Sequence, residues 1–324
     1  MKTILLLFGG ISDERYLSER SAKFIFNNIN TKKWKIFPIK WEKNGKFLIY
    51  DGKFCDIVAV YNNFFEIINT INFDIIFNLL HGKDECNGIL NGFLEFLKIP
   101  YIGNSMYTNF LCFNKFYTKL IFSFLKIRTP RFFLIKNNMP FCFKNLKFPI
   151  IIKPSLSGSS IGVKKINNEK EMIFWINQLF KREFDEIIIE EFIDGEEYSV
   201  CVIGDYRDKN KIILPVAKIN YVGEIFDEKL KYECNYKVNI PSGLPQAMEK
   251  EIIKISLKLH NFLKATYITR TDLIVKSNKI YVLEVNSSPG LSSHSIISQI
   301  LSFLSYNIEE IFEFLINQAT LYKF

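Results

Sequence analysis

The sequence predicts an α/β protein built from two or three packed subdomains. Its 324 residues exceed the size at which one hydrophobic core usually stops growing. Hydrophobic residues make up 48% of the chain and charged residues 23%, which is normal for a folded globular protein and excludes a disordered one. In the first hundred residues, strand-like apolar runs alternate with helical patterns, as in a sheet layered with helices.

The chain opens with a strand, a glycine turn and a helix. Residues 2–8 are predicted to form a buried strand, and Gly9-Gly10 the turn after it. The helix is predicted over 13–28, with Ser12 or Asp13 as its N-cap. The other elements predicted in this first domain are strands at 34–39 and 73–79 and a helix at 88–97.

Two further domains are predicted, so that the limits are 1–103, 104–183 and 184–324. The elements predicted for the central domain are a helix at 107–125, strands at 130–135, 149–153 and 162–166, and a helix at 169–180. The third domain begins with strands at 186–189 and 198–203. Its helix at 247–264 carries one apolar stripe at spacings of four and three residues.

A hairpin in the third domain brings three oxygen donors together. Its strands are predicted at 269–275 and 279–285, with a polar turn between them. If the turn centres on Asn278, Asp272 lies opposite Glu284, and Arg270 lies opposite Asn286. Side chains alternate along a strand, so Asp272, Glu284 and Asn286 share a face, and such donors suit Mg²⁺ with nucleotide phosphates. The alternative is that both acids pair with Arg270 on a solvated face.

Two segments rich in small residues are suited to anions. Ser287 to Ser295 ends at a predicted helix N-terminus, where free amides and hydroxyls favour a carboxylate. Lys153 ends a strand and precedes a Ser/Gly loop that runs to Gly162, whose amides could close over phosphates. An ordinary turn is the alternative for that loop. The chain contains neither a P-loop nor a Gly-x-Gly-x-x-Gly motif.

Composition argues against several other function classes. The 42 Lys+Arg and 34 Asp+Glu residues give a net charge of +8, but the basic residues are spread along the chain. Heavy use of Phe, Ile, Asn and Lys indicates an AT-rich genome, so nucleic acid is not expected as a partner. No apolar run reaches 18 residues, no signal peptide is evident, and the six cysteines form no Cys-x-x-Cys pair. We therefore expect a cytoplasmic protein with reduced thiols and no membrane partner.

Six motifs, in order along the chain, resemble those of the D-alanine:D-alanine ligases, a family of the ATP-grasp superfamily. The resemblance covers nearly the full length and implies a three-domain ATP-grasp architecture. In it, an N-terminal βαβ domain precedes central and C-terminal domains that bind the nucleotide between them. The motifs are Gly9 to Arg15, Leu80-His81-Gly82, Lys153 to Gly162, Lys231-Tyr232, Arg270-Thr271-Asp272 and Leu283 to Gly290.

The resemblance implies a homodimeric ligase. In such enzymes ATP phosphorylates the carboxylate of one D-alanine, and the amine of a second D-alanine attacks the acyl phosphate to give a peptidoglycan precursor. The residues that it assigns to the nucleotide and metal are Lys115, Lys153 and Lys231 for the phosphates, Glu190 for the adenine amino group, Glu197 for the ribose hydroxyls, and Asp272, Glu284 and Asn286 for Mg²⁺ or Mn²⁺.

The resemblance also assigns the groups around the amino acids. Glu14 would bind the ammonium of the first D-alanine, linked through Ser159 to Tyr232. A tyrosine at this position resembles the dipeptide-forming members, whereas phenylalanine is associated with relatives that use D-lactate. The remaining assignments are Arg270 and the Gly290 amide for the oxyanion, His81 for substrate, and Ser295 for the second substrate's carboxylate.

The chain departs from the family pattern after Leu80-His81-Gly82. The family usually continues to Gly-Glu-Asp-Gly, whereas this chain has Cys86 where an acid is expected. That acid normally helps to hold the lysine-tyrosine loop, so lower turnover is expected unless Asp84 or Glu85 takes its place. Two other functions therefore stay open: a related carboxylate-amine ligase, and an ATP-grasp nucleotide-binding protein with weakened or lost catalysis.

Overall fold

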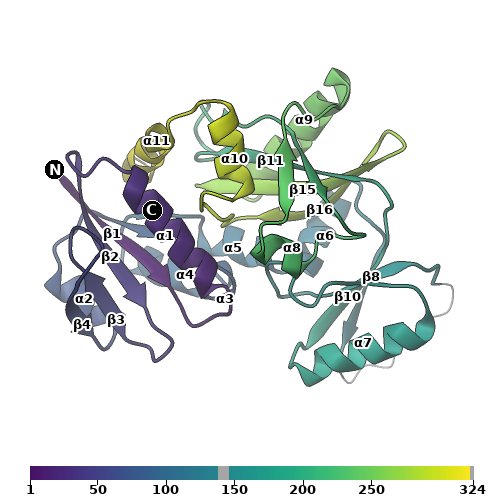
Figure 1. Ribbon diagram of the computed structural model, residues 1–324, viewed down its shortest axis with the longest axis horizontal. Coiled ribbons are helices and arrows are strands. Elements are labelled where there is room, and N and C mark those ends of the chain that lie inside the picture. The colour runs from purple at the N-terminus through teal and green to yellow at the C-terminus, as the bar shows by residue number, and fades with distance from the viewer. Residues whose placement is uncertain (138–145, 322–324) are drawn as a thin grey trace.

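The computed structural model describes residues 1–137 and 146–321 and contains three separate β-sheets, each with its own helices (Figure 1). The first sheet lies at the left of Figure 1, the four-stranded second sheet at the lower right, and the third sheet above it. Within these residues, no helix is both long enough and apolar enough to cross a membrane.

The first sheet has the strand order β4-β3-β2-β1-β5-β6. Its central strand β1 pairs in parallel with β2 and β5, and Leu5, Leu6 and Leu7 are buried because both faces of the sheet are covered. The antiparallel strands β3 and β4 were not predicted. The elements here are β1 (Lys2–Gly9), α1 (Arg15–Asn28), β2 (Trp34–Trp41), β3 (Phe47–Tyr50), β4 (Ile57–Tyr61), α2 (Phe64–Thr70), β5 (Ile75–Asn78), α3 (Lys83–Cys86), α4 (Ile89–Phe96) and β6 (Tyr101–Ile102).

The predicted cap of the first helix is wrong. Helix α1 begins at Arg15 after Glu14, and no side chain caps it. The Ser12 hydroxyl instead donates to the carbonyl of His81 (3.1 Å), and the Ser12 amide donates to the Asp84 carboxylate (2.7 Å). The residues that resemble a cap therefore tie the first turn to the segment that follows β5.

The second sheet has the order β7-β10-β8-β9, with all pairs antiparallel. Helix α7 covers one face with Met172, Ile176 and Leu179. Strand β10 lies inside this sheet, although the predicted third domain begins at residue 184, because it pairs with both β7 and β8. The division into three domains itself stays a prediction. The elements are β7 (Phe132–Lys136), β8 (Ile150–Pro154), β9 (Lys164–Ile166), α7 (Glu169–Lys181) and β10 (Glu186–Glu191).

The helix predicted at 107–125 is two helices, α5 (Met106–Phe113) and α6 (Lys115–Phe124). Asn114 interrupts them with an extended backbone, and its side chain accepts hydrogen bonds from the amides of Phe116 and Tyr117, both at 3.1 Å. The Lys115 amide then donates to the carbonyl of Ser155 (3.0 Å). The break therefore places Lys115 beside the Ser/Gly loop.

The third sheet has the order β14-β13-β11-β15-β16, with β12 paired to β11. The predicted pairs Asp272–Glu284 and Arg270–Asn286 are confirmed. The turn contains only Ser277 and Asn278, both with positive φ. The elements are β11 (Glu196–Ile203), β12 (Ile212–Ile213), β13 (Ala217–Tyr221), α8 (Glu228–Tyr232), β14 (Tyr236–Asn239), α9 (Gln246–Phe262), β15 (Ile268–Lys276), β16 (Lys279–Asn286), α10 (Ile296–Phe303) and α11 (Ile308–Leu321).

A bulge in the hairpin produces the predicted register. With a two-residue turn and a regular ladder, Asp272 would lie opposite Leu283, and Glu284 would face the other side of the sheet. The ladder instead shifts between Asp272 and Leu273, so that one extra residue of β16, Leu283, is inserted. The predicted pairing is thus correct, but it arises from a shorter turn combined with a bulge.

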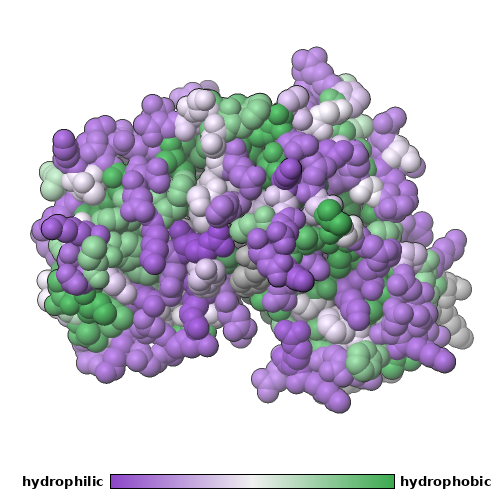
Figure 2. Space-filling model, viewed as in Figure 1, coloured by the Kyte–Doolittle hydropathy of each residue, from purple (hydrophilic) through white to green (hydrophobic). Residues whose placement is uncertain are grey.

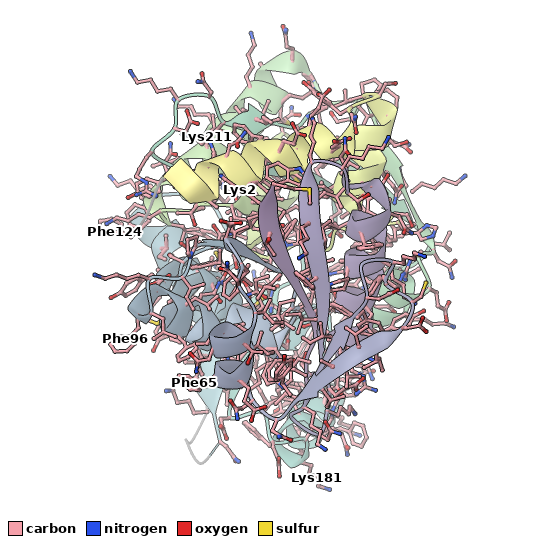
Figure 3. All side chains as sticks on the ribbon, turned by 90° about the vertical axis from the view of Figure 1, so that its left-hand side faces the viewer. Lys2, Phe65, Phe96, Phe124, Lys181 and Lys211 are labelled. Carbon is pink, nitrogen blue, oxygen red and sulfur yellow. The ribbon has the colours of Figure 1, made fainter. Side chains whose placement is uncertain are left out.

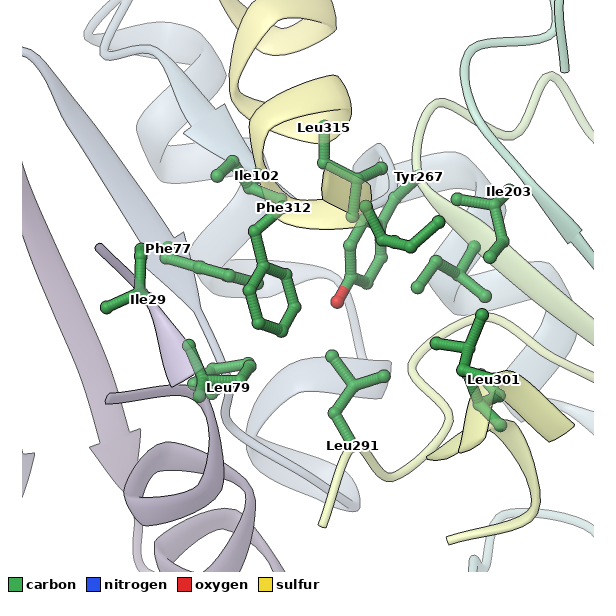
Figure 4. Close-up of a cluster of buried hydrophobic side chains, with 14 of the residues drawn as sticks. Ile29, Phe77, Leu79, Ile102, Ile203, Tyr267, Leu291, Leu301, Phe312 and Leu315 are labelled. Carbon is green, nitrogen blue, oxygen red and sulfur yellow. The ribbon is translucent and has the colours of Figure 1, made fainter. Parts of the chain in front are cut away.

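The largest core joins the first sheet to the C-terminal part of the chain. Figure 4 shows Phe312 and Leu315 of α11 between Phe77 of β5 and Tyr267, which precedes β15. The Phe77 ring meets the rings of Phe312 and Tyr267 edge-on, at centroid distances of 5.7 and 6.3 Å. In Figure 3, α11 crosses above the strands of the first sheet, so its apolar side is covered by this contact.

Asn104 is a buried polar link between the first sheet and the third. Its side-chain amide donates to the carbonyls of Ile268 (2.8 Å) and Ser287 (2.6 Å). Its side-chain oxygen accepts from the amides of Thr266 (2.8 Å) and Tyr267 (3.1 Å). One side chain thus satisfies four backbone groups near the beginning of β15 and the end of β16.

We expect Asn104→Ala to lower the free energy of unfolding by about 3 kcal/mol, because it leaves several buried backbone groups without partners. Urea denaturation measures the change. Asn28→Ala is the matched control, since the exposed Asn28 side chain bonds only within its own helix end, to the Phe24 carbonyl. A loss below about 1 kcal/mol for Asn104→Ala would contradict the assigned role of this link.

Candidate active site

A pocket of about 640 Å³ lies where the three sheets meet. Figure 2 shows mainly hydrophilic side chains around the opening between the left and right parts of the molecule. Tyr232 belongs to α8, but its side chain lies outside what the structure describes. The other predicted site residues all line this pocket: Glu14, His81, Lys115, Lys153, Ser159, Glu190, Glu197, Lys231, Arg270, Asp272, Glu284, Asn286, Gly290 and Ser295.

The polar face of the hairpin forms one wall. Arg270 donates to both oxygens of Asp272, from Nε at 2.8 Å and from Nη2 at 2.7 Å. Asp272 also accepts from Ser199 (2.6 Å) and from the side-chain amide of Asn286 (2.8 Å). The acid therefore does pair with Arg270, as the alternative supposed, but it does so in a buried pocket wall and not on a solvated face.

Three lysines surround Glu284. The Lys115 ammonium lies 3.9 Å from a Glu284 carboxylate oxygen, and Lys231 and Lys153 add to the positive potential. Burial raises the pKa of Glu284, but these cations outweigh burial and lower that pKa to about 2. Glu284 is therefore ionised at neutral pH. Burial lowers the pKa of Lys115, which Glu284 partly offsets.

Glu190 is held by two lysines, one of which the sequence analysis missed. Lys153 contacts one carboxylate oxygen at 2.6 Å, and Lys119 contacts the other at 2.8 Å. Lys119 is fully buried and donates to the Thr129 hydroxyl at 2.7 Å. Burial raises the pKa of Glu190, but the two lysines outweigh burial and lower that pKa overall. In this lysine-rich chain no local pattern distinguished Lys119 from the others.

Glu14 lies at the bottom of the first turn, enclosed by glycines. A Cβ atom on Gly82 or Gly158 would overlap the Glu14 carboxylate, which explains why small residues stand at both positions. Ser159 donates to this carboxylate, as the resemblance implies. Burial raises the pKa of Glu14, opposed by Ser159 and by nearby lysines. Glu14 is thus a buried acid that lines the pocket together with Lys115 and Lys231.

His81 and Ser295 make hydrogen bonds within the chain. The His81 Nε2 atom lies 3.0 Å from the Ser21 hydroxyl, which in turn accepts from the Leu291 amide (3.2 Å). Burial lowers the pKa of His81 to about 4, so the ring is neutral at pH 7 and can act on a substrate only by hydrogen bonding. Ser295 caps α10 by accepting from the Ser298 amide (3.2 Å), so the predicted helix N-terminus is present.

Cys86 is the residue of α3 that faces the pocket. Asp84 accepts from the Ser12 amide instead, and Glu85 is buried against the side-chain amides of Asn78, Asn91 and Asn109. Burial raises the pKa of Glu85 to about 8 and also raises the pKa of the Cys86 thiol. Neither Asp84 nor Glu85 therefore takes the place of the acid that the family pattern has at the position of Cys86.

Two further pocket contacts involve residues that sequence analysis did not single out. The Tyr221 hydroxyl donates to Glu197 at 3.0 Å, and the Ser160 hydroxyl donates to the Phe226 carbonyl at 2.8 Å. Burial raises the pKa of Glu197 to about 7. These contacts join β13 and the segment before α8 to the pocket residues Glu197 and Ser160.

Known proteins that resemble this chain over nearly its full length include D-alanine–D-alanine ligases. Residues 3–104 match the family model described as "D-ala D-ala ligase N-terminus", and residues 121–317 match "D-ala D-ala ligase C-terminus". The curated "D-alanine--D-alanine ligase" of Flavobacterium johnsoniae is 30% identical over 321 residues, which cover 96% of this chain and 97% of that protein.

Solved structures agree in fold. The VanG D-Ala:D-Ser ligase from Enterococcus faecalis has a TM-score of 0.82 at 28% identity, covering 98% of this chain and 99% of that one. A D-alanine--D-alanine ligase from Bacillus anthracis complexed with ATP has a TM-score of 0.80 at 24% identity, covering 99% and 98%. These matches confirm the predicted α/β ATP-grasp architecture. The chain belongs to the D-alanine–D-alanine ligase family.

Proposed function

We propose that this chain joins two D-alanine molecules to D-alanyl-D-alanine, with conversion of ATP to ADP and phosphate, as a step of peptidoglycan precursor synthesis. The observation that carries the proposal is the pocket in which a cation-rich wall, a carboxylate acceptor and an oxyanion-binding arginine converge. The names of the curated relatives support the same reaction. Homodimer formation and a cytoplasmic location remain expectations from the family.

The lysines can offset the repulsion between the two anions that react in the first step. A D-alanine carboxylate and the γ-phosphate of ATP repel each other, so positive charge must already be in place around both. Lys115, Lys153 and Lys231 line the pocket for this role. Glu190 lies on β10 of the second sheet and Glu197 on β11 of the third, and they are proposed to bind the adenine amino group and the ribose hydroxyls.

The hairpin face fits Mg²⁺ or Mn²⁺. Asp272, Glu284 and Asn286 offer two carboxylates and an amide oxygen, and Mg²⁺ typically takes one or two carboxylates and completes its shell with water and phosphate oxygens. The ion would neutralise phosphate charge.

Side chains and a backbone amide of this chain have roles in both steps, phosphoryl transfer and amine attack. A carboxylate oxygen of the first D-alanine, whose ammonium is held by Glu14, bonds to the γ-phosphorus as the bond to ADP breaks. The neutral amine of the second D-alanine attacks the acyl carbon and loses one proton, and the phosphate leaves with the shared oxygen and can take up that proton. Arg270, held in place by Asp272, and the Gly290 amide stabilise the oxyanion between these events.

The second substrate is proposed to be D-alanine because residue 232 is a tyrosine, but a structural relative is named a D-Ala:D-Ser ligase. The test is ADP release with Mg-ATP and D-alanine alone, or with D-serine, D-lactate or L-alanine added, and identification of the product by mass. The proposal requires D-alanine-dependent release and a D-alanyl-D-alanine product. Nucleotide binding without release for any acceptor would instead support the decayed-enzyme alternative.

We expect Glu284→Ala and Arg270→Ala each to lower kcat at least about 100-fold while the fold is kept, because each removes charge stabilisation from the reacting groups. Steady-state ADP release measures the loss, and circular dichroism checks the fold. Glu251→Ala, at an exposed position of α9, is the control and is expected to match wild type. Near-wild-type turnover in either site variant would remove that residue from the proposed mechanism.

We expect Cys86→Glu to raise kcat or leave it unchanged, since an acid at this position could pair with a lysine that lines the same pocket. Cys86→Gln serves as the matched variant, with similar size and no charge. A rise for glutamate and none for glutamine would identify the charge as the cause. A large loss with both would show that the α3 turn has been rebuilt around the thiol.

A further inference from the structure

We infer that Tyr221 is a positioning residue for Glu197 and that it thereby sets how strongly the enzyme selects a nucleotide with ribose hydroxyls. The inference rests on the proposed function, in which Glu197 binds the ribose. Tyr221 does not belong to any motif of the family resemblance. Its role follows from its place on the third sheet, its hydrogen bond and its packing.

The pairing of β11 with β13 brings the two side chains to one face. Glu197 lies opposite Ile219, and Tyr221 follows Ile219 by two residues, so its side chain points to the same side of the sheet as Glu197. Such a diagonal pair is separated by about 7–8 Å between Cα atoms, which a tyrosine can bridge. Both residues line the pocket.

The Tyr221 hydroxyl donates to one carboxylate oxygen of Glu197, Oε2, at 3.0 Å. A carboxylate has about four acceptor positions, so Oε1 and one side of Oε2 stay available for hydroxyl donors from a ligand. Glu197 keeps part of its surface open to the pocket, which is the direction from which such a ligand would come. The bond fixes the rotation of the carboxylate before nucleotide binds.

Aromatic packing fixes the donor itself. The Tyr221 ring stacks on Phe226 at a centroid distance of 5.2 Å and an interplanar angle of 16°. Phe226 meets Tyr236 edge-on at 5.0 Å, and Tyr236 lies opposite Tyr221 in the pairing of β13 with β14. Because Tyr221 stacks on Phe226, which Tyr236 holds in turn, its ring has fewer alternative rotamers, and the hydroxyl is held at the carboxylate at little further entropic cost.

A purely structural role for the hydroxyl is the competing explanation. The backbone ladder already joins β11 to β13 over Glu197 to Ser199, and the Tyr221 ring contacts Phe226 without its hydroxyl. Removing the oxygen therefore leaves the strand pairing and the stack in place. What changes is the set of hydrogen bonds that hold Glu197, and only a ligand that uses Glu197 should sense the change.

The test compares KM and kcat of wild type and Tyr221→Phe for ATP, 2′-deoxy-ATP and 3′-deoxy-ATP at saturating D-alanine. We expect Tyr221→Phe to raise the KM for ATP about tenfold, as for loss of a hydrogen bond to a charged group, with kcat changed less than about twofold. The KM for at least one deoxynucleotide should stay unchanged, so the preference for ATP over it falls about tenfold.

Tyr198→Phe is the matched control. Tyr198 lies on β11 beside Glu197 and donates its hydroxyl to Glu196 at 2.7 Å, but it belongs to the core on the other face of the strand. It should leave the nucleotide preference at the wild-type value. An equal rise in KM for all three nucleotides in Tyr221→Phe, or the same loss of preference in Tyr198→Phe, would overturn the inference.

Glu197→Gln separates this inference from the proposed function. If Glu197→Gln and Tyr221→Phe both reduce the preference for ATP over a deoxynucleotide, the inference holds. If Glu197→Gln reduces it and Tyr221→Phe does not, Tyr221 has no positioning role, although the ribose assignment stands. If neither does, the ribose assignment of Glu197 is wrong and the inference fails with it, while D-alanine-dependent ADP release by wild type still tests the reaction itself.

Discussion

The ion pairs between buried lysines and the carboxylates of Glu190 and Glu284 are the interactions on which the rest of the pocket depends. Isolated buried charges are costly, so a buried lysine is stabilised by a nearby acid. Glu190 serves Lys153 and Lys119, and Glu284 serves Lys115. Lys115 and Lys153, which line the pocket, are thereby in place to contact the phosphates of an anionic ligand. The arrangement thus stores positive charge where the proposed reaction requires it.

Much of the fold could be predicted because its strands carry strong periodic signals. Strand β1 is buried on both sides and is continuously apolar, and the hairpin pairs Asp272 with Glu284 as predicted. The errors come from single residues that act through tertiary contacts. Asn114 divides one amphipathic pattern into two helices because its side chain caps the second, and Leu283 forms a bulge that corrects a turn shorter than expected. Neither effect has a signature in local hydrophobicity.

In the site, too, the residues within motifs were predicted, whereas the residues that hold them in place were not. Residues in motifs, such as Lys153 and Arg270, line the pocket as the sequence predicted. The residues behind them were missed, because Lys119, Asn104 and Tyr221 act by holding another group and stand in no motif. Their functions depend on which strands become neighbours, and one sequence gives no direct measure of that. The contacts that hold site residues in place are therefore the main information that the structure adds to the sequence.

In the proposed reaction, the pocket brings the carboxylate of one D-alanine against the γ-phosphate of ATP. Oxygen-isotope transfer tests this most directly. Purified protein would be given Mg-ATP and D-alanine labelled with ¹⁸O in its carboxylate, and the released phosphate analysed by mass spectrometry. We expect one ¹⁸O atom in each phosphate, because the shared oxygen leaves with phosphorus when the amine attacks. Dipeptide formation with unlabelled phosphate would contradict an acyl phosphate and, with it, the proposed use of the lysine-rich wall.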